Sequence, residues 1–323
     1  MSKPIILSTQ PLDANAEQKL AQHGEFPIVK EPTEAGLHAE AADAIAFVIR
    51  GQVPATPRLM NAAPHLKVIG RTGVGYETVD IPAATSRGIP VVNAPGAGAR
   101  AVAEAAIAFM LSLCKLVSHW DHETKRGNWN SRIGGRQAGD LDGKTLGIIG
   151  LGRIGQIVAK LARPFEMNII ARDPYLDPKI AEDLGVKLVS LDEVMSQSDF
   201  ITLHCPQNEE TMGMINRPLL TQVKPGSYFI NLARGGIVES LDPLHDMLVS
   251  GQLAGVALDV FAIEPPNHTH PIFREENFLC SPHALATSDG AMRRIFKSMA
   301  DDMAAILEGK QPQFVVNPEV LAK

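Results

Sequence analysis

Cysteine, aromatic residues and long apolar runs are all scarce in this chain. Cysteine accounts for 3 of its 323 residues and aromatic residues for 5%. Cys114, Cys205 and Cys280 lack the spacing of a metal site, so we expect buried free thiols in a reducing cytoplasm. The apolar run near the N-terminus is too short for a signal peptide, and no run approaches the length of a membrane span. These scarcities argue against a disulfide framework, a metal centre and a membrane partner.

Charge of either sign is not in large excess. The formal net charge is -6, which argues against a general affinity for nucleic acid. The composition, with 45% hydrophobic and 20% charged residues, is typical of a globular protein. A length of 323 residues exceeds one ordinary hydrophobic core, so two domains are expected.

Apolar segments alternate with helical patterns through most of the chain. Such alternation indicates an α/β fold, with parallel sheets covered by helices on both faces. In the first hundred residues we expect strands at 4–9, 26–30, 44–49, 66–70 and 89–93. After Thr145 we expect strands at 146–150, 168–172, 186–189, 199–204, 227–232, 255–260 and 278–281. The sequence therefore predicts two doubly wound, parallel-sheet domains.

A long helical stretch, from about Ala99 to about Arg126, separates the two runs of strands. It is apolar on several sides, which suits a domain junction or a subunit interface. A last amphipathic helix at about 288–308 precedes a tail, 314–317, that we expect to return to the first domain. The predicted domains are therefore a discontinuous one, residues 1–98 plus 289–323, and a second one, residues 99–288.

A glycine-rich loop follows the first strand of the second run. The apolar segment 146–149 leads into Gly150, Gly152 and Gly155, a helical pattern comes next, and Asp173 closes the following strand. Strand, GxGxxG, helix, strand and acid in this order indicate dinucleotide binding. The glycines permit a tight turn, a close approach of the backbone to a pyrophosphate, and close packing of helix on strand. The alternative is a glycine-rich turn that merely joins a strand to a helix.

Three chemically versatile side chains stand at the ends of later strands. They are Arg234, Glu264 and His283. Ligands of open α/β sheets bind outside the carboxyl ends of the strands, so these side chains are expected to converge. Arginine can hold a carboxylate or keto oxygen, histidine can exchange a hydroxyl proton, and glutamate can fix the histidine tautomer and favour its charged form. Each residue taken alone could equally be structural.

The chain resembles the D-isomer-specific, NAD-dependent 2-hydroxyacid dehydrogenases over nearly its whole length. The motifs that carry the resemblance lie at 68–76, 91–95, 102–104, 150–155, 203–206, 231–236, 258–265 and 281–283. The resemblance implies two Rossmann-like domains with the active site in the cleft between them. It implies Arg234, Glu264 and His283 as the catalytic trio, with the keto oxygen of a substrate between Arg234 and His283. It also implies a homodimer formed through the 99–140 region.

The same resemblance implies the binding residues. Cofactor contacts are expected at Thr78, Arg153, Ile154, Asp173, Cys205, Leu232, Arg234, Asp259 and His283, in addition to the three loop glycines. Backbone amides around Val74 and Gly75 are expected to hold the substrate carboxylate. Asp173 can bind the ribose hydroxyls and would repel a 2′-phosphate, whereas Arg172 before it could attract one, and we expect NAD rather than NADP.

The identity of the acid depends on two arginines. Arg50 and Arg71 resemble arginines of D-3-phosphoglycerate dehydrogenases in their sequence context, and a second anionic group on the substrate would need such cations. The alternative is that both are solvated or paired with nearby acids. Because we expect no long C-terminal regulatory extension, reduction of hydroxypyruvate or glyoxylate is an open alternative. Trp129 could enter a partner's pocket, as in some glyoxylate and hydroxypyruvate reductases, or pack in an interface.

Two rival functions share this fold. An NAD(H)-sensing corepressor would bind the cofactor to control assembly, but the chain shows no obvious disordered tail for recruiting partners. Formate and phosphite dehydrogenases use other hydride donors, and Ile263-Glu264-Pro265 argues against the formate enzyme. The sequence alone therefore favours a 2-oxo acid reductase with NAD as its cofactor and no metal.

Overall fold

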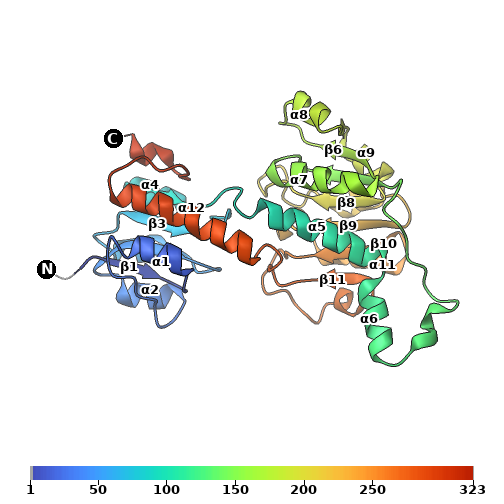
Figure 1. Ribbon diagram of the computed structural model, residues 1–323, viewed down its shortest axis with the longest axis horizontal. Helices are drawn as coiled ribbons and strands as arrows, with labels where there is room; N and C mark the ends of the chain where they lie inside the picture. Colours follow the sequence, from blue (N-terminus) through green and yellow to red (C-terminus); the bar gives the residue numbers. More distant parts are fainter. Residues whose placement is uncertain (1–2, 323) are drawn as a thin grey trace. The chain divides into compact units, whose positions relative to one another are not determined.

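The computed structural model describes residues 3–322 and divides into two compact units (Figure 1). Unit 1 runs up to Gly98 and resumes at Thr287, and unit 2 comprises Ala99–Ala286. No single helix of the described chain is long and apolar enough to cross a membrane. Helices α5 (Ala99–Cys114) and α6 (Val117–Lys125) reach that length only as a pair, which is bent by 58°.

Unit 1 is a four-stranded parallel sheet in the order β1-β2-β3-β4. Its strands are β1 (Ile5–Ser8), β2 (Ala44–Ile49), β3 (Val68–Arg71) and β4 (Val91–Val92). Its helices are α1 (Ala14–Leu20), α2 (Glu34–Glu40), α3 (Pro57–Asn61), α4 (Ile81–Ser86), α12 (Asp289–Leu307) and the 3-10 helix η5 (Pro318–Leu321). Each α-helix begins where a side-chain oxygen caps an N–H group, at Asp13, Thr33, Thr56, Asp80 and Ser288.

The two faces of this sheet bury different helices. Phe47 and Ile49 lie in a core with α2, α3 and α4, whereas Ala46 and Val48 lie in a core with α1 and α12. This alternation is the two-residue period of a strand that is buried on both faces. Helix α12 crosses β3 at Gly70, where an added Cβ atom would come within 2.2 Å of a methionine sulfur on that helix.

The chain after α12 is held against β4. The backbone N–H of Val316 donates to Val91 O at 2.8 Å, and the N–H of Val91 donates to Asn317 Oδ1 at 2.8 Å. Buried Asn317 also donates from Nδ2 to Ile89 O at 3.0 Å. The segment that ends the described chain therefore satisfies backbone groups of the edge strand, which would otherwise be unpaired.

The prediction of a strand at 26–30 is wrong. The segment makes only isolated bridges to β1, although the N–H of Ser8 donates to Pro27 O and the N–H of Val29 donates to Ser8 O. Proline lacks an N–H group, so Pro27 cannot donate to a regular ladder. The segment consequently lies beside β1 without becoming a strand.

Unit 2 is a seven-stranded parallel sheet in the order β11-β10-β9-β8-β5-β6-β7. Its strands are β5 (Thr145–Ile149), β6 (Asn168–Arg172), β7 (Lys187–Leu188), β8 (Phe200–Leu203), β9 (Ser227–Asn231), β10 (Leu253–Leu258) and β11 (Phe278–Cys280). Its α-helices are α5 (Ala99–Cys114), α6 (Val117–Lys125), α7 (Arg153–Ala162), α8 (Pro178–Asp183), α9 (Leu191–Gln197), α10 (Arg217–Leu220) and α11 (Leu241–Val249). Its 3-10 helices are η1 (Trp129–Arg132), η2 (Arg163–Phe165), η3 (Gly235–Ile237) and η4 (Pro271–Arg274).

The strand order reverses at β5. The chain runs outward from β5 through β6 to β7, and it then crosses back to β8 on the other side of β5. Helices α5 and α7 pack side by side on one face (Figure 1). Helices α9, α10 and α11 cover the other face. Such a reversal opens a crevice at the carboxyl end of the central strand, where ligands of this fold bind.

The prediction of a single long helix at 99–126 is also wrong. Helix α5 ends at Cys114, Leu116 adopts a left-handed conformation with φ of 54°, and α6 begins at Val117. The break coincides with a change in burial, because more than half of α5 is buried whereas α6 has no buried residue. Helix α5 is therefore a core element, whereas α6 extends the chain away from the core.

Candidate functional site

The glycine-rich loop after β5 has the geometry that its spacing predicts. Gly150 has φ of +94°, and a Cβ atom there would lie 2.5 Å from the backbone nitrogen of Cys205. A Cβ atom at Gly155 would lie 2.2 Å from Gly150 O. A Cβ atom at Gly152, by contrast, would meet no atom within 4 Å. Two glycines are thus required by packing, and the middle one borders open space.

Helix α7 presents its N-terminus to that open space. Gly152 is its N-cap and supplies no side-chain acceptor, so the first N–H groups lack a side-chain cap. Arg153, which is exposed, and Ile154, which is half-buried, form the first turn. An uncapped N-terminus beside an open glycine fits a pyrophosphate group, because its N–H groups and the helix dipole both favour an anion.

Asp173 lies where a Rossmann domain places its ribose-binding acid. Its Oδ2 accepts from Leu151 N in the glycine loop at 2.9 Å, and its Oδ1 accepts from Tyr175 N at 3.0 Å. The carboxylate therefore ties the loop after β6 to the loop after β5. A fixed carboxylate at this position fits the adenosine ribose of a dinucleotide.

The loop after β8 completes this side of the site. Burial raises the pKa of the Cys205 thiol to about 11, so the thiol stays protonated at neutral pH. Burial also lowers the pKa of neighbouring His204 to about 3. The expectation of three buried cysteines is wrong, because Cys114 is buried, Cys205 is half-buried and Cys280 is exposed. Cys280 is the last residue of β11, an edge strand, which explains its exposure.

The side chain of Asn231 holds the backbone of Arg234 at the carboxyl end of β9. Buried Asn231 donates from Nδ2 to Arg234 O at 2.9 Å and accepts from Ala233 N at 2.9 Å. The half-buried Arg234 side chain donates from Nη1 to Ala233 O at 2.8 Å, while Leu232 is buried. The turn packs directly on the next loop, since a Cβ atom at Gly235 would lie 1.9 Å from the carbonyl carbon of Phe261.

Glu264 and His283 form a hydrogen-bonded pair. His283 Nδ1 lies 3.0 Å from Glu264 Oε2, and Glu264 Oε1 accepts from Phe261 N at 3.1 Å. The glutamate side chain is 24% exposed and the histidine side chain 41% exposed. An ionised carboxylate only accepts, so Nδ1 carries the proton in this pair and Nε2 is the nitrogen left for proton exchange. The structure therefore brings together two of the three residues predicted as a catalytic trio.

His283 has an uncommon backbone conformation, with φ of +53°. Its N–H donates to Asp259 O at 2.8 Å, and Asp259 Oδ1 accepts from Ser281 Oγ at 2.6 Å and from Ala284 N at 3.0 Å. Asp259 is only 3% exposed. A non-glycine residue at positive φ persists only where its surroundings impose that conformation, and here Asp259 imposes it from both sides.

Two arginines of unit 1 lie at the ends of neighbouring strands. Arg71 ends β3, is buried, and donates from Nη1 to Ile49 O at 3.2 Å. Arg50 follows β2, donates to Pro11 O, and lies over the Phe296 ring at 4.8 Å from its centroid. Desolvation by burial lowers the pKa of Arg50. Both arginines thus already have contacts within the unit.

The loop after β3 contains Val74 and Gly75, whose backbone is expected to hold a carboxylate. Val74 is 47% exposed, and Asn93 donates from Nδ2 to Val74 O at 2.7 Å. Gly75 is half-buried. The Oγ1 atom of Thr78 is buried and has no hydrogen-bond partner among the described residues. An orphan hydroxyl costs free energy unless a water or ligand satisfies it.

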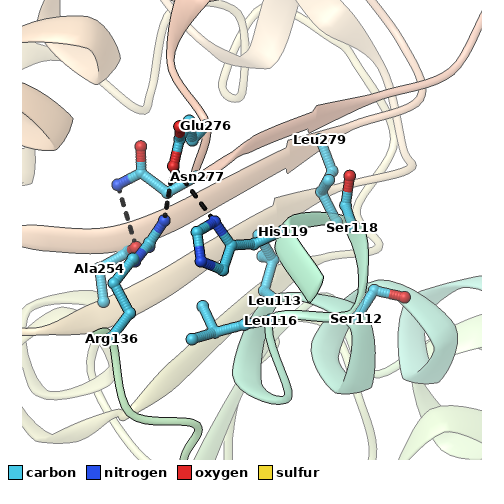
Figure 2. A pocket seen from close by; sticks show the side chains of 10 residues that line it. All are labelled: Ser112, Leu113, Leu116, Ser118, His119, Arg136, Ala254, Glu276, Asn277 and Leu279. Carbon is cyan, nitrogen blue, oxygen red and sulfur yellow. Dashed lines mark hydrogen bonds and ion pairs between the residues drawn. The ribbon is translucent and has the colours of Figure 1, made fainter. Parts of the chain in front are cut away.

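Unit 2 has a small hollow at the amino ends of β10 and β11. Figure 2 shows His119 and Arg136 turned toward Glu276, at 3.3 Å and 3.6 Å. Ala254 near the start of β10 and Asn277 just before β11 line the same hollow. These are the amino ends of the strands, away from the glycine loop, and the hollow has room for only about one water. No group of three or more potential metal ligands occurs in the described part of the chain.

Sequence reasoning missed the residues that hold the predicted ones in place. These are Asn93, Asn231 and Ser281, which brace the segments around Val74, Arg234 and His283. The sequence did contain a signal for these residues. Asn231 and Ser281 belong to the same short motifs as Arg234 and His283, and Asn93 belongs to the motif at 91–95, on the strand next to the one that precedes Val74.

Comparison with known proteins gives one consistent result. The family described as "D-isomer specific 2-hydroxyacid dehydrogenase, NAD binding domain" matches residues 107–284. A D-3-phosphoglycerate dehydrogenase from Archaeoglobus fulgidus is 37% identical over 314 residues, which cover 97% of this chain and 59% of that protein. The chain therefore spans about three fifths of the length of this curated relative.

Solved structures match over nearly their full length. A protein from Thermus thermophilus superposes with a TM-score of 0.89 at 30% identity, covering 97% of this chain and 99% of the other. A glyoxylate reductase from Paecilomyes thermophila superposes with a TM-score of 0.86 at 27% identity, covering 99% and 100%. The two-unit α/β fold expected from the sequence is confirmed.

Proposed function

The chain belongs to the D-isomer-specific 2-hydroxyacid dehydrogenase family, and from that premise we propose that it is an NAD-dependent oxidoreductase of D-2-hydroxy acids. The observation that carries this proposal is the Glu264–His283 pair, with 3.0 Å between its atoms, on the sheet that also holds the glycine loop. Bound NADH supplies a hydride to C2 of a 2-oxo acid.

His283 is the proposed acid and base. In reduction its Nε2–H donates a proton to the oxygen of the 2-oxo group, and in oxidation Nε2 accepts the hydroxyl proton. Glu264 accepts from Nδ1–H, which fixes the orientation of the ring and leaves Nε2 for proton exchange. The bond from Phe261 N to Glu264 keeps the carboxylate oriented. Groups that are oriented before the reaction begins in this way lower its barrier.

Arg234 is the proposed anchor for the substrate. A guanidinium has five N–H donors, enough to bind a carboxylate or keto oxygen in addition to the contact with Ala233 O. The brace from Asn231 sets the position of the Arg234 backbone. In unit 1, we propose that backbone N–H groups around Val74 and Gly75 bind the substrate carboxylate.

Asp173 is the proposed selector of NAD over NADP. Its carboxylate is held by Leu151 N and Tyr175 N, and a negative charge there repels a 2′-phosphate. Replacing Asp173 with Ser should weaken NADH binding relative to NADPH binding, measured by the fluorescence of the bound nicotinamide. An unchanged ratio would remove Asp173 from this role.

D-3-phosphoglycerate is the proposed physiological substrate, with Arg50 and Arg71 as its phosphate-binding residues. The name of the Archaeoglobus relative supports this choice. The contacts of Arg50 with Pro11 and Phe296 favour instead an unphosphorylated acid such as hydroxypyruvate or glyoxylate, as does the name of the Paecilomyes reductase.

The test is NADH oxidation with phosphohydroxypyruvate, hydroxypyruvate and glyoxylate supplied in parallel. A higher kcat/KM for the phosphorylated acid, lost in Arg50→Gln and Arg71→Gln, supports the phosphoglycerate assignment. Preference for an unphosphorylated acid assigns a general 2-oxo acid reductase. Tight NADH binding without turnover of any 2-oxo acid would contradict the enzymatic proposal.

We also propose a homodimer formed through the 99–140 region. Val117, Trp129 and Ile133 in this region are 52%, 64% and 71% exposed, and burying them against a second copy would remove apolar surface from water. The Trp129→Ser and Ile133→Ser variants should then sediment as monomers. A monomeric parent protein at micromolar concentration would contradict the proposal.

A further inference from the structure

Two loops that flank the glycine loop are joined by a side-chain hydrogen bond. Tyr175, in the loop after β6, donates from its phenol oxygen to Glu210 Oε2, in the loop after β8. Because β6 and β8 lie on opposite sides of β5, this bond spans the carboxyl end of β5. That strand end is where the glycine loop begins, so the bond joins the two loops that flank the predicted cofactor loop.

Each partner is held ready by its own loop. The Asp173 side chain accepts from the backbone N–H of Tyr175 at 3.0 Å. The Asn208 side chain accepts in the same way from Glu210 N at 3.0 Å. Such local side-chain bonds fix a turn and aim the side chain that follows. The bridge therefore joins two ordered turns.

The position of Tyr175 points to the adenosine half of a dinucleotide. It lies two residues after Asp173, the carboxylate that fits the ribose. Tyr175 is 75% exposed, so it contributes little to the core of unit 2. An exposed aromatic ring held by a hydrogen bond offers a flat apolar surface, which is the chemistry that packs against a purine.

We propose that Tyr175 and Glu210 form a clasp that retains the adenosine of bound NAD(H) and slows its release. The proposal rests on the cofactor assignment made above and assigns two residues that the dehydrogenase chemistry itself does not need. The hydrogen bond to Glu210 raises the pKa of the Tyr175 phenol, so the phenol remains a donor through the neutral range. On the Tyr175 side the clasp is anchored by Asp173. On the Glu210 side it is anchored through the loop after β8, because the N–H of Gly213 in that loop donates to Gly236 O, near Arg234.

The test measures the rate of NADH release by displacement in a stopped-flow instrument, using the full chain. The variants are Tyr175→Phe, Glu210→Gln and the double variant. Glu209→Gln is the matched control, because it removes the adjacent carboxylate, which has no hydrogen-bond or ion-pair partner among the described residues. Binding of ADP-ribose, which carries the adenosine but lacks the nicotinamide, is measured in parallel.

Loss of one exposed hydrogen bond should accelerate NADH release by about three- to five-fold in each single variant. The double variant should release NADH no faster than either single variant, since both break the same bond. ADP-ribose affinity should fall by the same factor, and Glu209→Gln should match the parent protein. Parent-like release rates in both Tyr175→Phe and Glu210→Gln overturn the clasp, and so does an effect on NADH without an effect on ADP-ribose. Failure of the parent protein to bind NADH at all overturns the cofactor assignment, which is a separate result.

Discussion

Acid should destabilise this protein through one buried histidine. His204 is 9% exposed, and its Nε2 lies 3.0 Å from Thr202 Oγ1. Its Nδ1 is buried without a hydrogen-bond partner in the described part of the chain. Burial lowers its pKa from 6.5 to about 3, so the folded protein keeps the ring neutral in mild acid. The unfolded chain, in which the ring is hydrated, binds a proton near its ordinary pKa.

The sign and size of the effect follow from this difference. Between the two pKa values the unfolded state holds one more proton than the folded state, so the free energy of unfolding falls as pH falls. The stabilisation is complete above pH 6.5 and is lost progressively as pH falls toward 3. The slope is about 1.4 kcal/mol per pH unit, which gives a loss of about 2 kcal/mol at about pH 5.

Urea unfolding at about pH 7.5 and about pH 5 measures this loss. His204→Gln keeps a neutral polar atom near Thr202 and removes the titrating ring, so its loss between the two pH values should be smaller by about 2 kcal/mol. His65→Gln, which removes an exposed imidazole, is the control. An identical loss in His204→Gln and the parent protein would refute the reasoning, whatever the absolute stability of the variant.

Three further outcomes are expected at the site and at the thiols. Glu264→Gln should lower kcat about ten-fold, because a charged hydrogen bond to the imidazole is lost. His283→Ala should lower kcat by about 10² to 10⁴ with NADH still bound. Equal kcat values in the two variants would contradict these roles. Ser281→Ala should lower kcat about three- to ten-fold, because the bond that supports the His283 loop is lost; a lower melting temperature at full kcat would assign Ser281 to stability alone. Iodoacetamide should modify exposed Cys280 before Cys205, as peptide mass spectrometry can show, and the reverse order would contradict the exposure and the raised pKa of Cys205.

Most of the fold could be predicted because parallel strands buried on both faces leave a strong apolar signal. The expected strand at 44–49 has the bounds of β2, and the one at 168–172 has those of β6. The two wrong predictions, the strand at 26–30 and the single helix at 99–126, failed for a common reason. Local hydrophobicity does not reveal either departure. The segment 26–30 has the composition of a strand but contains Pro27, and the stretch 99–126 has helical spacing throughout but breaks at Leu116. In both places the backbone departs from what the side-chain pattern predicts, at a proline in one and at a left-handed residue in the other.

The site was predictable to the extent that its residues follow strands. Gly150, Glu264 and His283 come from loops after different strands of one parallel sheet, and the carboxyl ends of such strands share an edge. Sequence order alone could not show that Asp259 shapes the backbone of His283, because that depends on contacts 24 residues apart. Nor could it show that Tyr175 meets the loop after β8.

The supporting contacts explain why the chemistry stays at one sheet edge. Asp173 ties the loop after β6 to the loop after β5, the glycine at 150 packs on the exit of β8, and the turn at Gly235 packs on the loop after β10. Each of these contacts joins loops that follow neighbouring strands. The Glu264–His283 pair stands at the far end of this series of loops from Asp173. The sheet thus positions the loops coarsely, and these contacts give the angstrom-level placement on which hydride and proton transfer depend.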